Sequence, residues 1–144
     1  MLKSVLVRDR MSTNSVLVRD HMSTNLVTLD PEMDILAGAH ELIANVIAGA
    51  PVVDENFRLI GILTERDCMR VVMQAEYHGM PGGPVRRYMS KNPVFVSPDE
   101  SILHVAQLFI DGKYHRYPVV EDERLVGMIS RRGVMRAMGQ QHPM

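Results

Sequence analysis

Two short segments of the chain combine a side-chain hydroxyl with the start of a helix. In residues 61–67 (GILTERD), an apolar stretch ends at Thr64, and Asp67 follows three residues later. Residues 127–133 (GMISRRG) repeat the pattern with Ser130 for the threonine and a glycine for the aspartate. A strand that ends there and opens a helix leaves backbone N–H groups without intrahelical partners, which suits an anionic or polar ligand. The sequence therefore predicts two related binding positions with different side chains.

The Thr64–Asp67 pair also has a purely structural interpretation. Its spacing is that of a near capping box, which stabilises a helix by about 1 kcal/mol without any ligand. Gly133 stands at the matching place of the second segment, so a related helix start exists without the carboxylate. Both interpretations stay open, and the glycine favours ligand contact for Asp67.

Other residue types indicate no reaction centre. The six histidines show no metal-ligand spacing with one another or with the single cysteine, so no metal site is predicted. Cys68 lacks a histidine and base arranged around it, and we predict a packed thiol. The sequence contains no carboxylate pair, nucleophile–base set or glycine-rich phosphate loop, so we expect no catalytic residues and no enzyme activity.

Composition narrows the class of protein. A chain of 144 residues that is 46% hydrophobic can bury the core of a single compact domain. Its formal net charge of −1 gives no general attraction to nucleic acid or to an anionic membrane. The sequence has no membrane-spanning apolar run and no signal peptide, and its lone cysteine fits a reducing compartment. We expect a cytoplasmic protein.

The chain contains two copies of one sequence unit. Met22-Ser-Thr-Asn25 recurs at Met89-Ser-Lys-Asn92, and Pro51-Val-Val recurs at Pro118-Val-Val, each at an offset of 67 residues (89 − 22 and 118 − 51). Such a register indicates duplication. We place the first unit at residues 20–76, a linker at 77–84, the second unit at 85–139 and a tail at 140–144.

Each unit is predicted to contain the same elements in the same order. A short strand leads to a helix that starts with a proline in its first turn, then come a β-hairpin and a closing helix. The expected first strands are residues 26–29 and 94–96, and the helices after them begin at Asp30-Pro31 and at Ser97. Each hairpin pairs a Pro-Val-Val strand with a second strand, residues 59–63 or 125–129. The closing helices are expected at 65–76 and 131–138.

The N-terminal extension, residues 1–19, contains part of a second and shorter repeat. Residues 4–14 (SVLVRDRMSTN) are followed directly by residues 15–25 (SVLVRDHMSTN), and only Arg10 against His21 differs. Only the second copy lies at the right distance from the first unit. We expect the first copy to be disordered or docked on a neighbour, and no function follows from its sequence.

The closing helices carry apolar stripes at helical spacing, which predict either core or a dimer face. The sheets already have the first helices to cover them, so we expect a two-fold homodimer. The stripe residues are Met69, Val72, Met73, Val134, Met135 and Met138.

These residues together resemble a known family. The repeated unit resembles a CBS (cystathionine β-synthase) domain in three motifs: Met-Ser near the start, Pro-Val-Val-Asp in the middle, and Gly-h-h-Thr-x-x-Asp before the last helix, where h is an apolar residue and x any residue. Two such units in tandem resemble a Bateman module. The resemblance implies an α/β (α+β) fold of two β-α-β-β-α units packed about a pseudo-twofold axis, with two clefts. It also implies that those clefts bind adenosine-containing ligands such as AMP, ADP or ATP, and sometimes NAD or S-adenosylmethionine.

The resemblance also implies roles for particular residues. Thr64 would contact phosphate or ribose, and Asp67 would accept hydrogen bonds from the ribose hydroxyls. Gly133 departs from the pattern, which leaves the second cleft without a ribose acceptor. The remaining candidates are Asn92, Pro93 and Val94 on the adenine side, Tyr114, His115 and Arg116 facing phosphate, and Ser130 and Arg131 at the second helix start. His115 and Arg116 are alternatively a solvated strand edge.

The leading functional hypothesis is a regulatory module that binds AMP, ADP or ATP, has no catalytic cofactor, and signals to an unknown regulated protein. The alternative is a dimerisation and protein-interaction module that binds no ligand.

Overall fold

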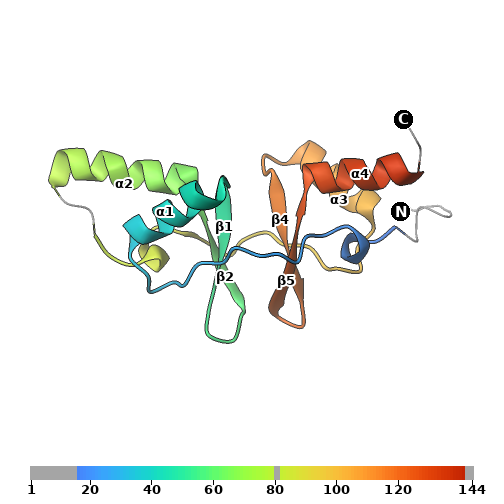
Figure 1. Cartoon of the computed structure of the whole chain (residues 1–144), viewed down its shortest axis with the longest axis horizontal. Coiled ribbons are helices and arrows are strands. Elements are labelled where there is room, and N and C mark those ends of the chain that lie inside the picture. The colour runs from blue at the N-terminus through green and yellow to red at the C-terminus, as the bar shows by residue number, and fades with distance from the viewer. Residues whose placement is uncertain (1–15, 80–81, 142–144) are drawn as a thin grey trace. The chain divides into compact units, whose positions relative to one another are not determined.

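The computed structural model describes residues 16–79 and 82–141, which form two compact units (Figure 1). The Thr64 unit consists of residues 27–93 and 123–125, and the Ser130 unit of the described residues up to 26, residues 94–122 and those from 126 onwards. The prediction of a single compact domain is wrong, because each unit has a hydrophobic core of its own. The expected mixture of helices and small sheets is confirmed.

In the Thr64 unit, a hairpin is covered by helices. Strands β1 (Gly49–Val53) and β2 (Leu59–Thr64) pair antiparallel, and the short β3 (Ser90–Lys91) adds to the other edge of β2. The helices are α1 (Ile35–Asn45), α2 (Glu65–His78) and the 3-10 turn η3 (Val85–Arg87). The buried core residues include Leu29, Ile35, Leu42, Val52, Leu63, Val71 and Val85.

The Ser130 unit repeats this plan. Its hairpin is formed by β4 (Arg116–Glu121) and β5 (Arg124–Ser130), whose first two residues group with the other unit. The helices are the 3-10 turn η2 (Val18–Asp20), α3 (Ile102–Asp111) and α4 (Arg131–Gln141). The buried core residues include Val18, Val96, Ile102, Val105, Val119, Ile129 and Val134.

The Met-Ser segments are exchanged between the repeats. Met89, from the second repeat, packs its Sδ 2.5 Å from the position of a Cβ at Gly61, which belongs to the first repeat. Met22, from the first repeat, packs in the same way at 2.6 Å from Gly127. Each hairpin therefore receives its Met-Ser edge from the other copy of the sequence.

The first helix of each repeat starts later than predicted. Asp30 and Ser97 form local turns instead of helix starts, since Asp30 accepts from the N–H of Glu32 at 2.7 Å and Ser97 from that of Asp99 at 3.2 Å. The N-caps are Asp34 and Ser101, four residues further along, and each accepts from the N–H two residues ahead. The duplication is preserved, because 101 − 34 is again 67.

The strands expected at 26–29 and 94–96 are reduced to single parallel pairs. Leu29 pairs with Val52, and Val96 pairs with Val119. The closing helices begin at Glu65 and Arg131 as predicted and run further than predicted, to His78 and Gln141. Within residues 16–79 and 82–141, no helix is long and apolar enough to cross a membrane.

Candidate functional site

The junction of β2 and α2 is closed by a reciprocal capping box. Thr64 is the N-cap, and its Oγ1 accepts a hydrogen bond from the N–H of Asp67 at 3.2 Å. In return, Oδ2 of Asp67 accepts from the N–H of Thr64 at 2.9 Å and from its hydroxyl at 3.0 Å. The capping interpretation of this pair is therefore confirmed, and any ligand would have to share the carboxylate with the helix start.

The Asp67 carboxylate is buried and largely satisfied. Asp67 is 3% exposed, and its Oδ1 accepts from the guanidinium of Arg70 at 3.0 Å. A carboxylate offers about four acceptor positions, of which three are filled here. The side chain of Arg70 is 64% exposed and can move away at little cost, whereas Thr64 cannot. Oδ1 is consequently the oxygen that a ligand could reach.

Cys68 lies beside this site and is a packed thiol, as predicted. Its side chain is buried in the core of the Thr64 unit. Burial raises the pKa of the thiol, and the negative charges of Asp67 and Glu65 raise it further. The thiol is thus kept protonated and unreactive at neutral pH.

The junction of β5 and α4 has the same backbone geometry and a different charge. The hydroxyl of Ser130 accepts from the N–H of Gly133 at 3.0 Å, so half of the capping box remains. The N–H of Arg131 donates to the carbonyl of His115 at 3.3 Å, and the Arg131 guanidinium is hydrogen-bonded to the His115 ring. Cationic and imidazole groups therefore replace the carboxylate at this helix start.

Arg116 adds a second guanidinium to the Ser130 unit. It begins β4 directly after His115 and is half-buried, and this burial lowers its pKa. Within the described ranges, no carboxylate lies at ion-pair distance from it. A guanidinium stays charged at neutral pH even so, which leaves a partly desolvated positive charge that an anion would satisfy.

The structure divides the predicted site residues between the two units. Thr64 and Asp67 lie in the Thr64 unit together with Asn92 and Pro93, which follow β3; Asn92 has a left-handed φ of 55°. The other six candidates lie in the Ser130 unit: Val94, Tyr114, His115, Arg116, Ser130 and Arg131. The Asp67 carboxylate and the cationic candidates thus belong to different compact units.

Sequence reasoning missed the residues that flank the Thr64 junction. The offset of 67 maps Tyr114, His115 and Arg116 onto Ile47, Ala48 and Gly49. The structure bears out this equivalence, because the N–H of Glu65 donates to the carbonyl of Ala48 at 2.8 Å, as Arg131 does to His115. The duplication could have identified these residues, and it could have shown that they carry no charge.

Comparison with known proteins finds the same duplicated unit. The family model described as "CBS domain" matches residues 18–74 and again residues 85–140. An A-adding tRNA nucleotidyltransferase of Geobacter sulfurreducens is 34% identical over 109 residues, which are 75% of this chain and 12% of that protein. An inosine-5'-monophosphate dehydrogenase of Aquifex aeolicus is 31% identical over 111 residues, which are 76% of this chain and 22% of that protein.

An uncharacterized protein of Methanocaldococcus jannaschii is 27% identical over 112 residues, 78% of this chain and 39% of that protein. The chain thus spans less than half the length of each of these three relatives. Among solved structures, CBSX2 of Arabidopsis thaliana in complex with AMP superposes with a TM-score of 0.76 at 26% identity, covering 88% of this chain and 98% of that one.

The CBS domain pair of protein MJ0100, in complex with 5'-methylthioadenosine and S-adenosyl-L-methionine, superposes with a TM-score of 0.72 at 28% identity, covering 88% of this chain and 98% of that one. The two family matches coincide with the duplication found in the sequence and together cover more than half of the chain. The protein therefore belongs to the CBS domain family and carries a tandem pair of CBS domains.

Proposed function

We propose that this protein is a regulatory module that binds an adenosine-containing ligand and signals its presence to a partner protein. The observation that carries the proposal is the buried carboxylate of Asp67 at the start of α2, with one oxygen held only by an exposed arginine. The AMP complex of CBSX2 and the methylthioadenosine and S-adenosylmethionine complex of MJ0100 support the same ligand class. No catalytic role is proposed for any residue of this chain.

In this proposal, the ribose is recognised at the Thr64 junction. Its two hydroxyls donate to Oδ1 of Asp67 after Arg70 has turned away, while Thr64 keeps Oδ2 in place. Charge-assisted hydrogen bonds of this kind are worth roughly 1.5–3 kcal/mol. Asn92 and Pro93, which lie in the same unit as Asp67, are the proposed adenine contacts, since a tight turn and an apolar side chain suit a planar base.

A separate anion-binding position is assigned to the cationic residues of the Ser130 unit. Arg116 is a partly desolvated guanidinium, and His115 and Arg131 lie at the start of α4, where the helix dipole also favours an anion. Tyr114 is exposed next to them. A phosphate group suits this position, which therefore favours AMP, ADP or ATP there over an unphosphorylated nucleoside.

AMP is expected to raise the thermal unfolding midpoint of the protein, and 2'-deoxy-AMP is expected to raise it clearly less at the same concentration. A ligand at one hundred times its dissociation constant stabilises by about 2.7 kcal/mol, which thermal-shift measurement detects easily. The deoxy analogue is the matched control, because it lacks one of the hydroxyls assigned to Asp67. Equal shifts would reject the ribose contact, and no shift with AMP, ADP, ATP or S-adenosylmethionine would leave the interaction module as the function.

We also infer a homodimer from the exposed face of α2. Met69, Val72 and Met73 are 60%, 59% and 55% exposed, although they are spaced as one helical stripe. On α4, Val134 is buried and Met138 is partly buried in the core of its own unit, whereas Met135 is 60% exposed. A stripe of three large apolar side chains in water is typical of an interface.

Light scattering after gel filtration is expected to give twice the chain mass, and Val72→Glu is expected to give the monomer. A charge in the middle of the stripe would be desolvated in the interface, which is strongly unfavourable. Ile43→Glu is the matched control, because Ile43 is exposed on α1, away from the stripe in sequence. A monomeric wild type at micromolar concentration would contradict the inference.

A further inference from the structure

Arg70 holds the accessible oxygen of the Asp67 carboxylate through a single contact. Its Nη1 donates to Oδ1 of Asp67 at 3.0 Å, three residues along α2. The side chain of Asp67 is 4% exposed, whereas that of Arg70 is 64% exposed. An exposed pair at this spacing changes an equilibrium constant by roughly twofold. The arginine therefore occupies the position assigned to the ribose hydroxyls, and a ligand can displace it at small cost.

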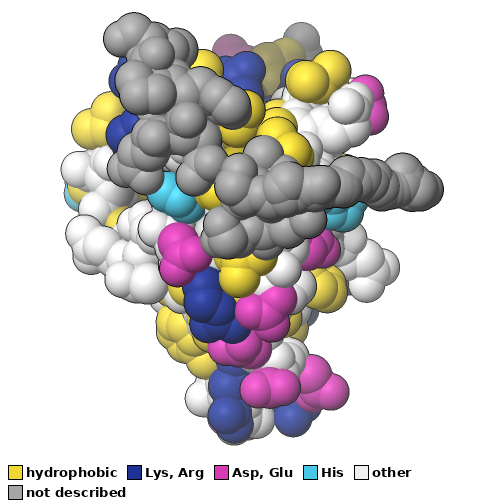
Figure 2. Space-filling view, turned by 90° about the vertical axis from the view of Figure 1, so that its right-hand side faces the viewer, with side chains coloured by type: hydrophobic (Ala, Val, Ile, Leu, Met, Phe, Trp, Pro, Cys, Tyr) yellow, Lys and Arg dark blue, Asp and Glu magenta, His cyan; other side chains and the backbone are white. Residues whose placement is uncertain are grey.

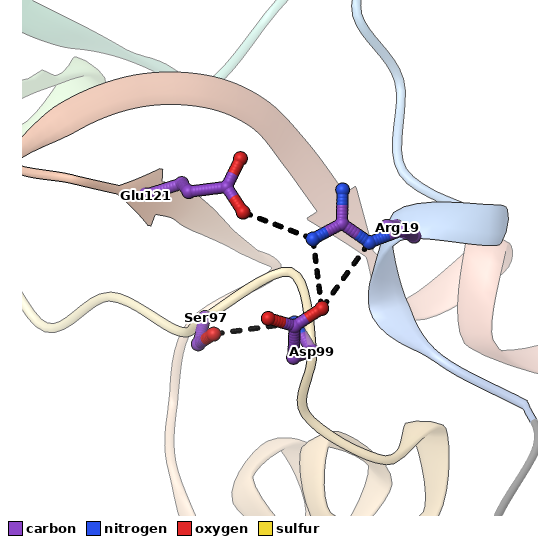
Figure 3. A network of polar contacts seen from close by, with 4 residues as sticks. All are labelled: Arg19, Ser97, Asp99 and Glu121. Carbon is purple, nitrogen blue, oxygen red and sulfur yellow. Dashed lines mark hydrogen bonds and ion pairs between the residues drawn. The ribbon is translucent and has the colours of Figure 1, made fainter.

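Arg19, in the Ser130 unit, shows how a structural arginine differs. Its guanidinium bonds to Asp99 at 2.7 and 3.2 Å and to Glu121 at 2.9 Å, so it joins the turn η2 to two other segments of its unit (Figure 3). Side chains of both charges also lie next to one another on the face shown in Figure 2. Arg70 bonds instead to a residue of its own helix, so this contact links no second element to α2. The contact adds little to the fold and leaves the guanidinium available to a ligand.

The duplication separates this arginine from its carboxylate. At the offset of 66 residues that relates the two closing helices (130 − 64), Arg136 stands at the place of Arg70 and Gly133 at the place of Asp67. The arginine is thus present in the copy that has no carboxylate for it to neutralise. A role shared by both arginines must involve another group, and a guanidinium matches the geometry of a phosphate.

The Thr64 unit lacks the cations that the Ser130 unit offers to an anion. Residues 47–49 (IAG) match residues 114–116 (YHR) and carry no charge. Arg70 is the guanidinium that the structure places on the ribose acceptor itself. Once displaced from Oδ1, it stays next to the bound sugar, whose 5' carbon carries the phosphate of a nucleotide. Arg70 is therefore well placed to recognise that phosphate.

We propose that Arg70 exchanges partners when a nucleotide binds: it holds Asp67 in the free protein and the phosphate of the nucleotide in the complex. The inference rests on the proposed adenosine-ligand function and extends it, because it names the residue that selects phosphorylated ligands at the Thr64 junction. The ribose hydroxyls replace the donor that Oδ1 loses, so the buried carboxylate stays satisfied. Adenosine displaces Arg70 without offering it a new anion, which makes adenosine the weaker ligand.

Calorimetric titration of Arg70→Ala with AMP and with adenosine tests the exchange. AMP should bind roughly tenfold more weakly than to the wild type, because a charge-assisted contact to phosphate is lost. Adenosine should bind as tightly as before or up to about twofold more tightly, because no arginine has to be displaced. An arginine with a merely structural role would change both affinities in the same direction or neither.

Arg86→Ala is the matched control, since Arg86 also makes an exposed ion pair in the Thr64 unit, with Glu32 at 2.8 Å, and should leave both affinities unchanged. Arg70→Lys keeps the charge without the planar fork of donors, so it should recover part of the AMP affinity. Added salt should weaken AMP binding to the wild type more than to Arg70→Ala, because the lost contact joins two exposed charges.

The outcomes separate this inference from the proposed function. Arg70→Ala that binds AMP as tightly as the wild type, or that gains affinity for AMP and adenosine alike, overturns the exchange and leaves the adenosine-ligand function in place. A wild type that binds neither ligand overturns both. Alanine is a good helix former and the lost pair is exposed, so the variant is expected to fold, with its unfolding equilibrium changed by about twofold or less.

Discussion

Gly61→Val is expected to destabilise the Thr64 unit by about 3 kcal/mol, because β2 and β3 approach too closely at this residue for any side chain. A Cβ at Gly61 would lie 2.5 Å from Sδ and 2.9 Å from Cγ of Met89, and 2.9 Å from the carbonyl oxygen of Ser90. The methionine can adopt another rotamer. The carbonyl belongs to β3, which pairs with β2 at this point, so relief requires the strands to separate.

Urea unfolding of Gly61→Val measures the effect, and the chain offers two matched variants. Gly82→Val is the control, since a Cβ there meets nothing within 4 Å and should change stability by about 0.5 kcal/mol or less. Gly127→Val should match Gly61→Val, because its Cβ would lie 2.6 Å from Sδ of Met22 and 3.0 Å from the carbonyl of Ser23. Stability of Gly61→Val equal to that of Gly82→Val would contradict the close-approach argument.

Features that depend on a few neighbouring residues could be predicted from the sequence. The hairpins around Pro51 and Pro118 and the starts of both closing helices follow from apolar strands that end at a hydroxyl. The capping box needs only Thr64 and Asp67 at the right spacing. The first helices were harder, because Asp30 and Asp34 are both good N-caps, and only the packed structure shows that the first of them forms a turn.

Features that depend on a choice between two equivalent partners could not be predicted. Both repeats contain the same Met-Ser segment and the same strand glycine. The neighbouring residues therefore do not determine that Met22 packs on Gly127 and Met89 on Gly61. The division of the candidate site has the same origin. Asp67 and Arg116 were both candidates through the family resemblance, and the contacts that define the compact units assign them to different units.

The two copies of the duplicated unit differ chemically at the starts of their closing helices. Both keep a hydroxyl N-cap that accepts from the N–H three residues on, at Thr64 and at Ser130. They differ in the third residue of the helix, which is a buried carboxylate in one and a glycine in the other. The helix start therefore folds without the carboxylate, which adds about 1 kcal/mol of capping and, in the proposed function, a ligand acceptor.

Transfer of the carboxylate from one helix start to the other is expected to transfer the tight nucleotide site with it. Asp67→Ala should lower the free energy of unfolding by about 2 kcal/mol, because the Thr64 N–H and the Arg70 guanidinium lose their acceptor. Loss of the ribose contact should weaken AMP binding tenfold to a hundredfold. Asp34→Ala removes a helix cap without touching the site, and should cost about 1 kcal/mol while leaving AMP affinity unchanged.

Gly133→Asp is the reciprocal change, and calorimetric titration with AMP should move from one tight site per chain in the wild type toward two. A Cβ at Gly133 would lie 3.3 Å from Cδ1 of Ile129, so that side chain must shift by a few tenths of an ångström, and 3.4 Å from Oγ of Ser130 and the carbonyl of His21, at a φ that any residue adopts. The new carboxylate can complete a capping box with Ser130, as Asp67 does with Thr64. Two equivalent tight sites in the wild type, or unchanged AMP affinity in Asp67→Ala, would show that the carboxylate only caps its helix.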